Sequence, residues 1–222
     1  MSELARRHSE ILRIKSLSPE AILQKTQRVK ESFIGWPIHK GLDGYPYSLF
    51  PLTDGPIDPS LVEDMADLII HSDKRNNFEK ADILVSEGDR GGGLLAQAIG
   101  TKTGIPITLA NWHAVPPNAP GIVSVTAAIG FSGRGDIAIY GIQPGQNVIV
   151  VDDLLSTGGT SKALFEAIFK MGAHIEEAFF VGEKVNLGGR NNIAEKFPNI
   201  KITSFARFIS EEENGVTIDA DL

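Results

Sequence analysis

The pattern of apolar and polar positions predicts helices and strands in alternation from residue 60 onward. Apolar residues recur at helical spacing in three segments: Ser60–Ser72, Gly91–Thr103 and Thr160–Met171. Short apolar runs that predict strands fall between and after these segments: Ala81–Val85, Ile105–Ala110, Ile122–Ile129, Asp136–Gly141, Val148–Val151, Ile175–Val181 and Ile200–Phe208. Strands that alternate with helices indicate an α/β fold with a mainly parallel sheet.

The first 35 residues follow a different pattern, rich in charged residues and helix formers. Two short amphipathic helices are expected, over Glu3–Ile14 and Pro19–Ser32. Ser18 suits the N-cap of the second helix, and Pro19 suits its first turn. A packing arm or a contact within a dimer is the plainest interpretation of such a segment. The Gly-, Pro- and aromatic-rich stretch Gly35–Pro59 then indicates a connector or lid.

Composition narrows the class of protein. The chain has 222 residues, of which 42% are hydrophobic and 22% charged, as in ordinary globular proteins. We expect an N-terminal helical arm or hood, 1–45, and a core domain, 46–222. The formal net charge of −7 argues against bulk binding of nucleic acid, and the absence of cysteine excludes disulfides and thiolate sites. No signal peptide and no apolar run of ~20 residues is evident, so a cytoplasmic protein with no membrane partner is expected.

The strongest chemical signal is the run VIVVDDLLSTGGTS at Val148–Ser161. A buried strand ends in two acids, Asp152 and Asp153, and a short loop leads into a helix. Open α/β folds bind ligands at this carboxyl edge of the sheet, and paired carboxylates suit sugar hydroxyls or Mg²⁺. Gly158 and Gly159 let backbone N–H groups approach a phosphate at the positive end of the helix. Three hydroxyl side chains complete the loop: Ser156, Thr157 and Thr160. A phosphorylated ribose fits this combination.

A second Gly-rich turn, SEGDRGGG at 86–93, also follows a strand and opens a helix. Its backbone and helix N-terminus predict another anion site, to which Arg90 would add a charge-assisted contact. Taken alone, the turn is explained equally well by structural needs.

The run Val148–Ser161 resembles the phosphoribosyl pyrophosphate (PRPP) motif of type I phosphoribosyltransferases. The resemblance is nearest to the adenine type and the archaeal hypoxanthine-type relatives, and it extends from about Phe50 to Asp219. It implies that family's fold, a mainly parallel twisted sheet flanked by helices, with a small hood and a flexible flap. The segments around Gly121–Val125 and Gly130–Asp136 match the position of the flap, which would exclude water when closed. A simple hairpin is also compatible with them.

The resemblance assigns roles to individual residues. The implied catalytic groups are Asp152, Asp153 and Arg90. The implied PRPP contacts are Asp89, Arg90, Gly91, Asp152, Asp153, Ser156, Thr157, Gly158, Gly159 and Thr160. The implied base pocket contains Phe50 and Leu155. Mg²⁺ is the implied cofactor and would come with PRPP, with Asp152 as the one candidate side-chain ligand.

The chain also departs from the family pattern. Leu109–His113 (LANWH) stands where adenine-type enzymes have an Arg–Lys pair for pyrophosphate. Gly130 stands where the adenine-type flap has a Glu, and Ser156 where hypoxanthine-type enzymes have an Asp. Lys184 could reach a purine carbonyl oxygen, although an exposed surface lysine is the plainer interpretation. Glu183 is expected to be structural.

The resemblance implies a phosphoribosyltransferase, a glycosyltransferase of purine salvage similar to the adenine type. Such an enzyme converts a purine-like base and PRPP to a nucleoside 5-monophosphate and pyrophosphate, and it commonly forms a homodimer. Because the basic pair and the flap Glu are missing, a PRPP-binding regulatory protein without turnover is the alternative. An unrelated α/β enzyme that binds a phosphosugar is a third hypothesis. Adenine, hypoxanthine, guanine and xanthine all remain candidate bases.

Overall fold

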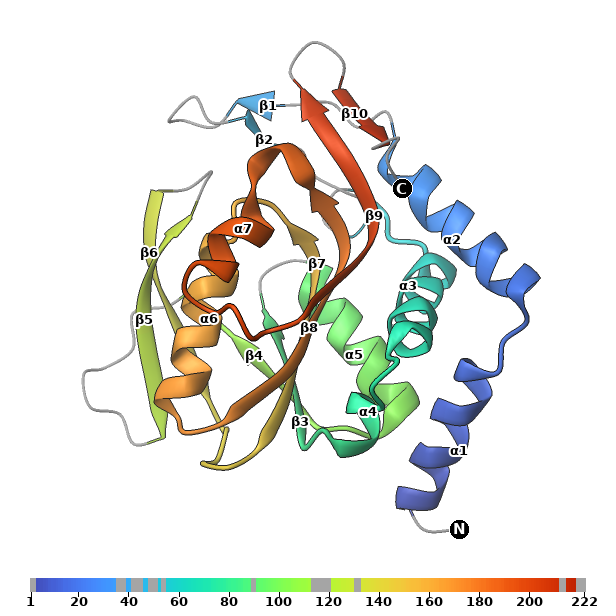
Figure 1. Ribbon diagram of the computed structural model, residues 1–222, viewed down its shortest axis with the longest axis horizontal. Helices are drawn as coiled ribbons and strands as arrows, with labels where there is room; N and C mark the ends of the chain where they lie inside the picture. The colour runs from blue at the N-terminus through green and yellow to red at the C-terminus, as the bar shows by residue number, and fades with distance from the viewer. Residues whose placement is uncertain are drawn as a thin grey trace.

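A twisted six-stranded sheet crosses the middle of the molecule (Figure 1). The computed structural model describes residues 3–34, 39–40, 46–47, 52, 55–88, 91–112, 121–129, 133–211 and 215–218. The sheet order is β10-β9-β8-β7-β3-β4, and all neighbours are parallel except β10 and β9. The strands are β3 (Ile83–Glu87), β4 (Ile107–Ala110), β7 (Asn147–Leu155), β8 (His174–Lys184), β9 (Ile202–Glu211) and β10 (Gly215–Ile218). The predicted α/β fold with a mainly parallel sheet is confirmed.

Helices cover both faces of this sheet (Figure 1). One side carries α1 (Glu3–Lys15), α2 (Pro19–Phe33), α3 (Pro59–Ser72), α4 (Asn77–Lys80) and α5 (Gly91–Thr103). The other side carries α6 (Gly159–Lys170), the 3₁₀ turn η1 (Val185–Leu187) and α7 (Gly189–Ala194). A separate hydrophobic cluster lies on each side, so the central strands β3, β7 and β8 are buried on both faces over most of their length.

An antiparallel ribbon stands beside α6 (Figure 1). Its strands are β5 (Ile122–Ile129) and β6 (Gly133–Tyr140), and their register runs from Ile122 opposite Tyr140 to Ile129 opposite Gly133. The sequence predicted that the second strand begins at Asp136, but residues 133–135 already pair with β5, so the strand begins three residues earlier than expected. A smaller pair, β1 (His39–Lys40) and β2 (Pro46–Tyr47), is also antiparallel.

The N-terminal helices form where the sequence predicted them, within one residue at each end. The Ser18 hydroxyl accepts a hydrogen bond from the backbone N–H of Ala21 at 3.2 Å, which confirms it as the N-cap. Both helices contribute side chains to the hydrophobic cluster that α3 and α5 share: Ile11, Ile14, Val29 and Phe33. The arm therefore packs against the sheet-bearing part of the chain, and the predicted division at residue 45 stays a prediction.

Buried ion pairs reinforce this packing. The Lys25 ammonium lies 2.6 Å from an Asp64 carboxylate oxygen and 3.0 Å from one of Asp67. The Lys102 ammonium of α5 approaches Asp67 at 3.1 Å. Because both carboxylates are nearly inaccessible, the loss of a cationic partner would leave a buried charge uncompensated. The contacts thus fix both α2 and α5 against α3.

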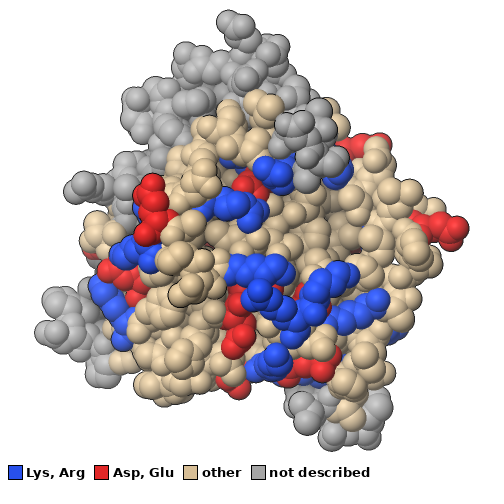
Figure 2. Space-filling view, in the orientation of Figure 1, with Lys and Arg blue, Asp and Glu red and all other residues tan. Residues whose placement is uncertain are grey.

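The surface carries charges of both signs. On the face that Figure 2 shows, Lys and Arg side chains gather in the lower half, with Asp and Glu side chains interspersed among them. None of the helices in the described residues has the length and hydropathy needed to cross a bilayer.

Candidate functional site

The two predicted acids lie at the carboxyl edge of the sheet. The apolar pattern ends at Val151, yet β7 continues to Leu155, because its ladder with β8 extends to the pair Leu155 and Glu183. Asp152 and Asp153 are thus part of a strand, which holds their backbone in place. Asp152 is only 8% exposed. Strand β3, which leads into the second Gly-rich turn, lies directly beside β7.

The two Gly-rich turns meet at these carboxylates. A Cβ placed on Gly91 would lie 2.5 Å from Oδ2 of Asp153, and a Cβ on Gly92 would collide with Oδ1 of Asp152. At Gly93, by contrast, the nearest atom is 3.5 Å away, an ordinary contact. The first two glycines therefore leave the space that the carboxylates occupy over the start of α5. The two motifs, some 60 residues apart in the sequence, form one site.

The site is strongly acidic. Burial raises the pKa of Asp152 well above its usual value, and the negative charges of Asp153 and Glu87 raise it further. Oδ1 of Asp152 accepts a hydrogen bond from the backbone N–H of Asp153 at 3.0 Å. A ligand that brings hydroxyl donors or a cation would stabilise the negative charge of these buried carboxylates. In the described parts of the chain, no group of three or more His, Asp or Glu side chains is arranged to hold a metal ion.

The loop after β7 rests on the backbone of α7. Gly158 has a left-handed φ of +78°, and a Cβ there would lie 2.8 Å from the carbonyl oxygen of Gly189. Gly189 itself has no room for a Cβ, which would collide with the carbonyl oxygen of Ser156. Nδ2 of Asn192 donates a hydrogen bond to the carbonyl oxygen of Thr157 at 2.7 Å. Sequence reasoning missed this support, although the Gly188–Gly189 pair after β8 was a signal for it.

Lys184 lies inside the protein, so the expectation of an exposed surface lysine was wrong. Strand β8 extends to this residue, which pairs with Phe208 of β9 and is only 3% exposed. Burial lowers the pKa of Lys184 to about 8, and the nearby Asp153 carboxylate opposes part of that shift. A buried, donor-only side chain is thus present at the carboxyl edge of the sheet, near the two acids.

Glu183 is held by its neighbours. Its carboxylate accepts hydrogen bonds from the Arg190 guanidinium at 3.0 and 2.5 Å and from the Ser204 hydroxyl at 2.5 Å. This bidentate pair ties the end of β8 to α7 and β9, which fits the predicted structural role.

Some of the residues that the sequence analysis singled out lie outside the described residues: Asp89, Arg90, Phe50, Gly130 and His113.

Leu155 is fully buried in the hydrophobic cluster around α6, which does not favour the predicted contact with a base.

In place of the family's basic pair, Nε1 of Trp112 donates to a carboxylate oxygen of Glu87 at 2.5 Å. That contact joins the ends of β3 and β4 without supplying a positive charge.

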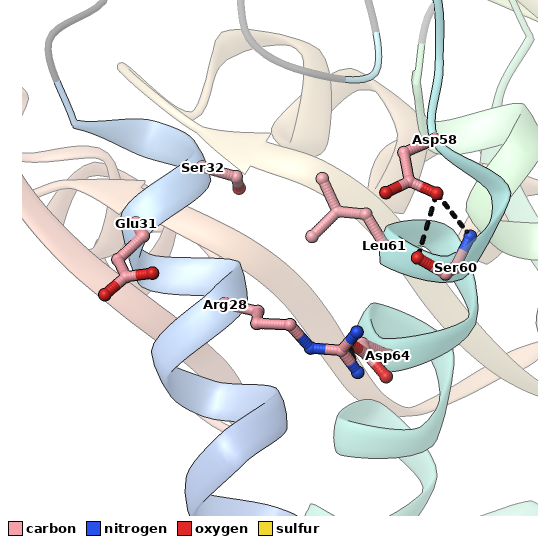
Figure 3. Close-up of a pocket in the computed structure, with 7 residues that line it drawn as sticks. All are labelled: Arg28, Glu31, Ser32, Asp58, Ser60, Leu61 and Asp64. Carbon is pink, nitrogen blue, oxygen red and sulfur yellow. Dashed lines mark hydrogen bonds and ion pairs between the residues drawn. The ribbon is translucent and has the colours of Figure 1, made fainter.

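A cavity of about 350 Å³ lies elsewhere, between α2 and α3 (Figure 3). Its lining residues are Arg28, Glu31, Ser32, Asp58, Ser60, Leu61 and Asp64. Figure 3 shows the Arg28 guanidinium reaching across to the Asp64 carboxylate, with which it forms an ion pair. Asp58 accepts hydrogen bonds from the N–H and hydroxyl of Ser60, both at 2.9 Å. The cavity contains none of the predicted site residues, and these polar groups are already paired with one another.

Comparison with known proteins identifies archaeal relatives. The chain is 35% identical over 157 residues to the hypoxanthine/guanine phosphoribosyltransferase of Methanosarcina acetivorans, covering 70% of this chain and 78% of that protein. It is 31% identical over 182 residues to the protein of the same name from Methanocaldococcus infernus, covering 81% and 93%. No family model matches the chain.

Solved structures show the same fold. Adenine phosphoribosyltransferase from Saccharomyces cerevisiae, solved with adenine and an imino-altritol bisphosphate, superposes with a TM-score of 0.65 at 23% identity, over 82% of this chain and 99% of that one. The enzyme of the same name from Rhodothermus marinus gives 0.65 at 15% identity, over 83% and 99%. Together with the archaeal relatives and the site geometry, this fold shows that the chain belongs to the type I phosphoribosyltransferase family and is a purine phosphoribosyltransferase.

Proposed function

We propose that the protein transfers the phosphoribosyl group of PRPP to a 6-oxopurine, hypoxanthine or guanine. The observation that carries this choice of base is the buried Lys184 at the end of β8. An ammonium only donates hydrogen bonds, so it suits the carbonyl oxygen of a 6-oxopurine and not the amino group of adenine. With a pKa of about 8, Lys184 is mostly protonated at neutral pH. The archaeal relatives carry hypoxanthine and guanine in their names, which supports the same choice.

In this proposal the carboxylates of Asp152 and Asp153 accept hydrogen bonds from the two ribose hydroxyls. The loop Ser156–Thr160 binds the 5-phosphate through its backbone N–H groups and hydroxyls, at the positive end of α6. The second turn, with Asp89, Arg90 and Gly91, binds pyrophosphate, and Arg90 supplies positive charge to the leaving group. Phe50 belongs to the base pocket. The chain's own part in catalysis is to position the base and the sugar and to exclude water.

Mg²⁺ belongs to the proposal as a partner of PRPP. The acidic surroundings of Asp152 fit a hard cation, since carboxylate oxygens are its preferred ligands. When bound, the ion would neutralise charge on the departing pyrophosphate. Asp152 is the candidate side-chain ligand of the Mg²⁺ ion, and the other ligands of the ion would come from PRPP and water. A homodimer and a cytoplasmic location remain predictions from the sequence. The regulatory alternative without turnover is not favoured by the relatives, which are named as enzymes.

The base assignment is tested by replacing Lys184 with Gln. With PRPP and Mg²⁺ present, pyrophosphate release is measured for hypoxanthine, guanine, xanthine and adenine. We expect the wild type to prefer hypoxanthine or guanine, and the K184Q variant to raise their KM by about 10- to 100-fold, the loss of one charge-assisted hydrogen bond. The exposed Lys170 of α6 provides the control, because K170Q should leave all KM values unchanged.

The pH dependence sharpens this test. Because the protonated lysine is the stronger, charge-assisted donor, the KM of the wild type for hypoxanthine should rise as pH increases through about 8. The K184Q variant should lack this rise, which separates the lysine from any ionisation of the base itself. Unchanged KM values for oxopurines in K184Q, or a preference of the wild type for adenine, would contradict the assignment.

A further inference from the structure

We propose that Asn192 is a positioning residue for the phosphate subsite. Its side chain fixes the peptide between Thr157 and Gly158, so that the Gly158 N–H faces the 5-phosphate. The inference rests on the proposed function, which makes Ser156–Thr160 the phosphate loop. It assigns a binding role to α7, a six-residue helix that contributes no residue to the predicted motifs.

Asn192 connects three elements through both ends of its amide. Nδ2 donates to the carbonyl oxygen of Thr157 at 2.7 Å, in the loop after β7. Oδ1 accepts from the ammonium of Lys162 at 2.6 Å, in the first turn of α6. Since an ammonium can only donate, the second contact determines which end of the amide faces Lys162. The NH₂ group is therefore directed at Thr157.

The peptide group converts this contact into an orientation of the next N–H. In a planar trans peptide the C=O and the following N–H point in opposite directions, and the described residues contain no cis peptide bond. The Thr157 carbonyl points toward α7, so the Gly158 N–H points to the other side of the loop. The Gly158 carbonyl accepts from the N–H of Lys162 at 2.9 Å and so belongs to the first turn of α6. The N–H thus stands at the positive end of that helix, where a phosphate binds.

The backbone of α7 keeps the loop in register with Asn192. Gly189 packs so closely under the carbonyl of Ser156 that a Cβ would not fit, and a Cβ on Gly158 would lie 2.8 Å from the carbonyl oxygen of Gly189. The loop therefore has little freedom to rotate the Thr157–Gly158 peptide while the hydrogen bond is present. Without the bond, that peptide gains an alternative in which its carbonyl faces the phosphate and repels it.

A purely structural role for Asn192 predicts a different outcome. In that case its loss would lower stability and affect both substrates alike. A positioning role predicts an effect on the phosphate-bearing substrate alone. The difference is therefore visible in the ratio of the two KM values rather than in activity.

The test compares two substitutions at this position. N192A removes both contacts, whereas N192D keeps the size and the Lys162 contact but removes the donor to Thr157. We expect N192A to raise the KM for PRPP and the Kd for ribose 5-phosphate by about three- to tenfold, the loss of one neutral hydrogen bond. N192D should raise both constants at least as much, because its carboxylate faces the Thr157 carbonyl oxygen and repels it. The KM for hypoxanthine and kcat should stay within about twofold. The exposed neighbour Asn191 gives the matched control, since N191A should change neither constant.

Two results would overturn the inference. One is an unchanged KM for PRPP in N192A and N192D. The other is a parallel rise of both KM values that follows a loss of thermal stability. The proposed function is judged separately, from the wild type: if the wild type binds neither ribose 5-phosphate nor PRPP, the phosphate loop itself is wrongly assigned and both proposals fail.

Discussion

The two Gly-rich turns of this protein, β3–α5 and β7–α6, have the same signature of strand, glycines and helix, yet their glycines serve different purposes. In the β3–α5 turn, Gly91 and Gly92 leave space for side chains, because the carboxylates of Asp153 and Asp152 lie where their Cβ atoms would be. In the β7–α6 turn, Gly158 serves the backbone, with a φ of +78° and the carbonyl of Gly189 close by.

This difference separates two kinds of constraint within one site. A carboxylate that is pushed aside can move by rotating its side chain. A substitution in the first turn should therefore change the free energy of unfolding little, while it weakens ligand binding. A carbonyl that is pushed aside takes the backbone with it, so the second turn is constrained by folding as well. The same motif can therefore be sensitive for functional or for structural reasons, and substitutions tell the two apart.

The largest effect is expected for the Gly158→Ala substitution. It should lower the free energy of unfolding by about 2–5 kcal/mol, of which ~1–2 kcal/mol is the cost of the left-handed φ and ~1–3 kcal/mol is overpacking against Gly189. Urea-induced unfolding measures this loss. Gly141 is the matched control: it has a φ of +84° but nothing within 4 Å of a Cβ, so G141A should pay only the conformational part. Equal losses in the two variants would show that the contact with α7 is not constraining.

A smaller and different effect is expected for Gly92→Ala. The new methyl group should displace the Asp152 carboxylate and raise the Kd for PRPP by about 10- to 100-fold, while the free energy of unfolding changes by less than about 1 kcal/mol, since Ala favours the helix. Calorimetry with PRPP and Mg²⁺ measures the affinity. G93A is the control, because a Cβ on Gly93 meets nothing closer than 3.5 Å. If both variants bind PRPP equally well, the carboxylates are not held as we describe.

The smallest effect is expected for Asp152→Asn, which should raise the stability of the folded protein, whereas Gly158→Ala lowers it. The pKa of Asp152 is raised in the folded state by burial and by Asp153 and Glu87. The folded protein therefore binds more protons than the unfolded chain, and Asp152 costs stability as pH rises above its ordinary pKa of ~3.9. D152N should raise Tm at pH 7 by about 2–8 °C, for a gain of ~1–2 kcal/mol, and by less near pH 4.

A second buried aspartate provides the contrast for that measurement. Asp73 accepts hydrogen bonds from the N–H groups of Arg75 and Phe78 and lies 3.6 Å from the Lys15 ammonium. Its charge is compensated, so D73N should lower Tm where D152N raises it. A lower Tm for D152N at pH 7 would show that the Asp152 carboxylate does not destabilise the free protein.

The helices and parallel strands could be predicted from the sequence because burial makes apolar residues recur at the spacing of each element, with polar residues between them. Gly91–Thr103 is helical at the predicted residues. Prediction failed where tertiary contacts extend an element beyond its apolar run. Strand β7 continues through two acids, and β8 continues to Lys184, since pairing with their neighbours holds them extended. The burial of Lys184 follows from that extension and was therefore not visible in the sequence.

The predicted site was similarly incomplete. The acids and the loop glycines form a recognisable sequence motif, because ligand binding and the start of a helix each require particular residue types. The support under the loop does not, because a single amide such as Asn192 and a close backbone contact such as Gly189 leave no spacing pattern. Helix α7 has only six residues, too few for an apolar period to appear.

Direct binding of PRPP tests whether the carboxylates of Asp152 and Asp153 bind the ribose hydroxyls. PRPP with Mg²⁺ is titrated calorimetrically into the wild type and into the double variant D152N/D153N, with circular dichroism and Tm confirming that both are folded. We expect saturable binding to the wild type and none detectable to the folded double variant. An unchanged affinity of the double variant for PRPP would contradict this role of the two carboxylates.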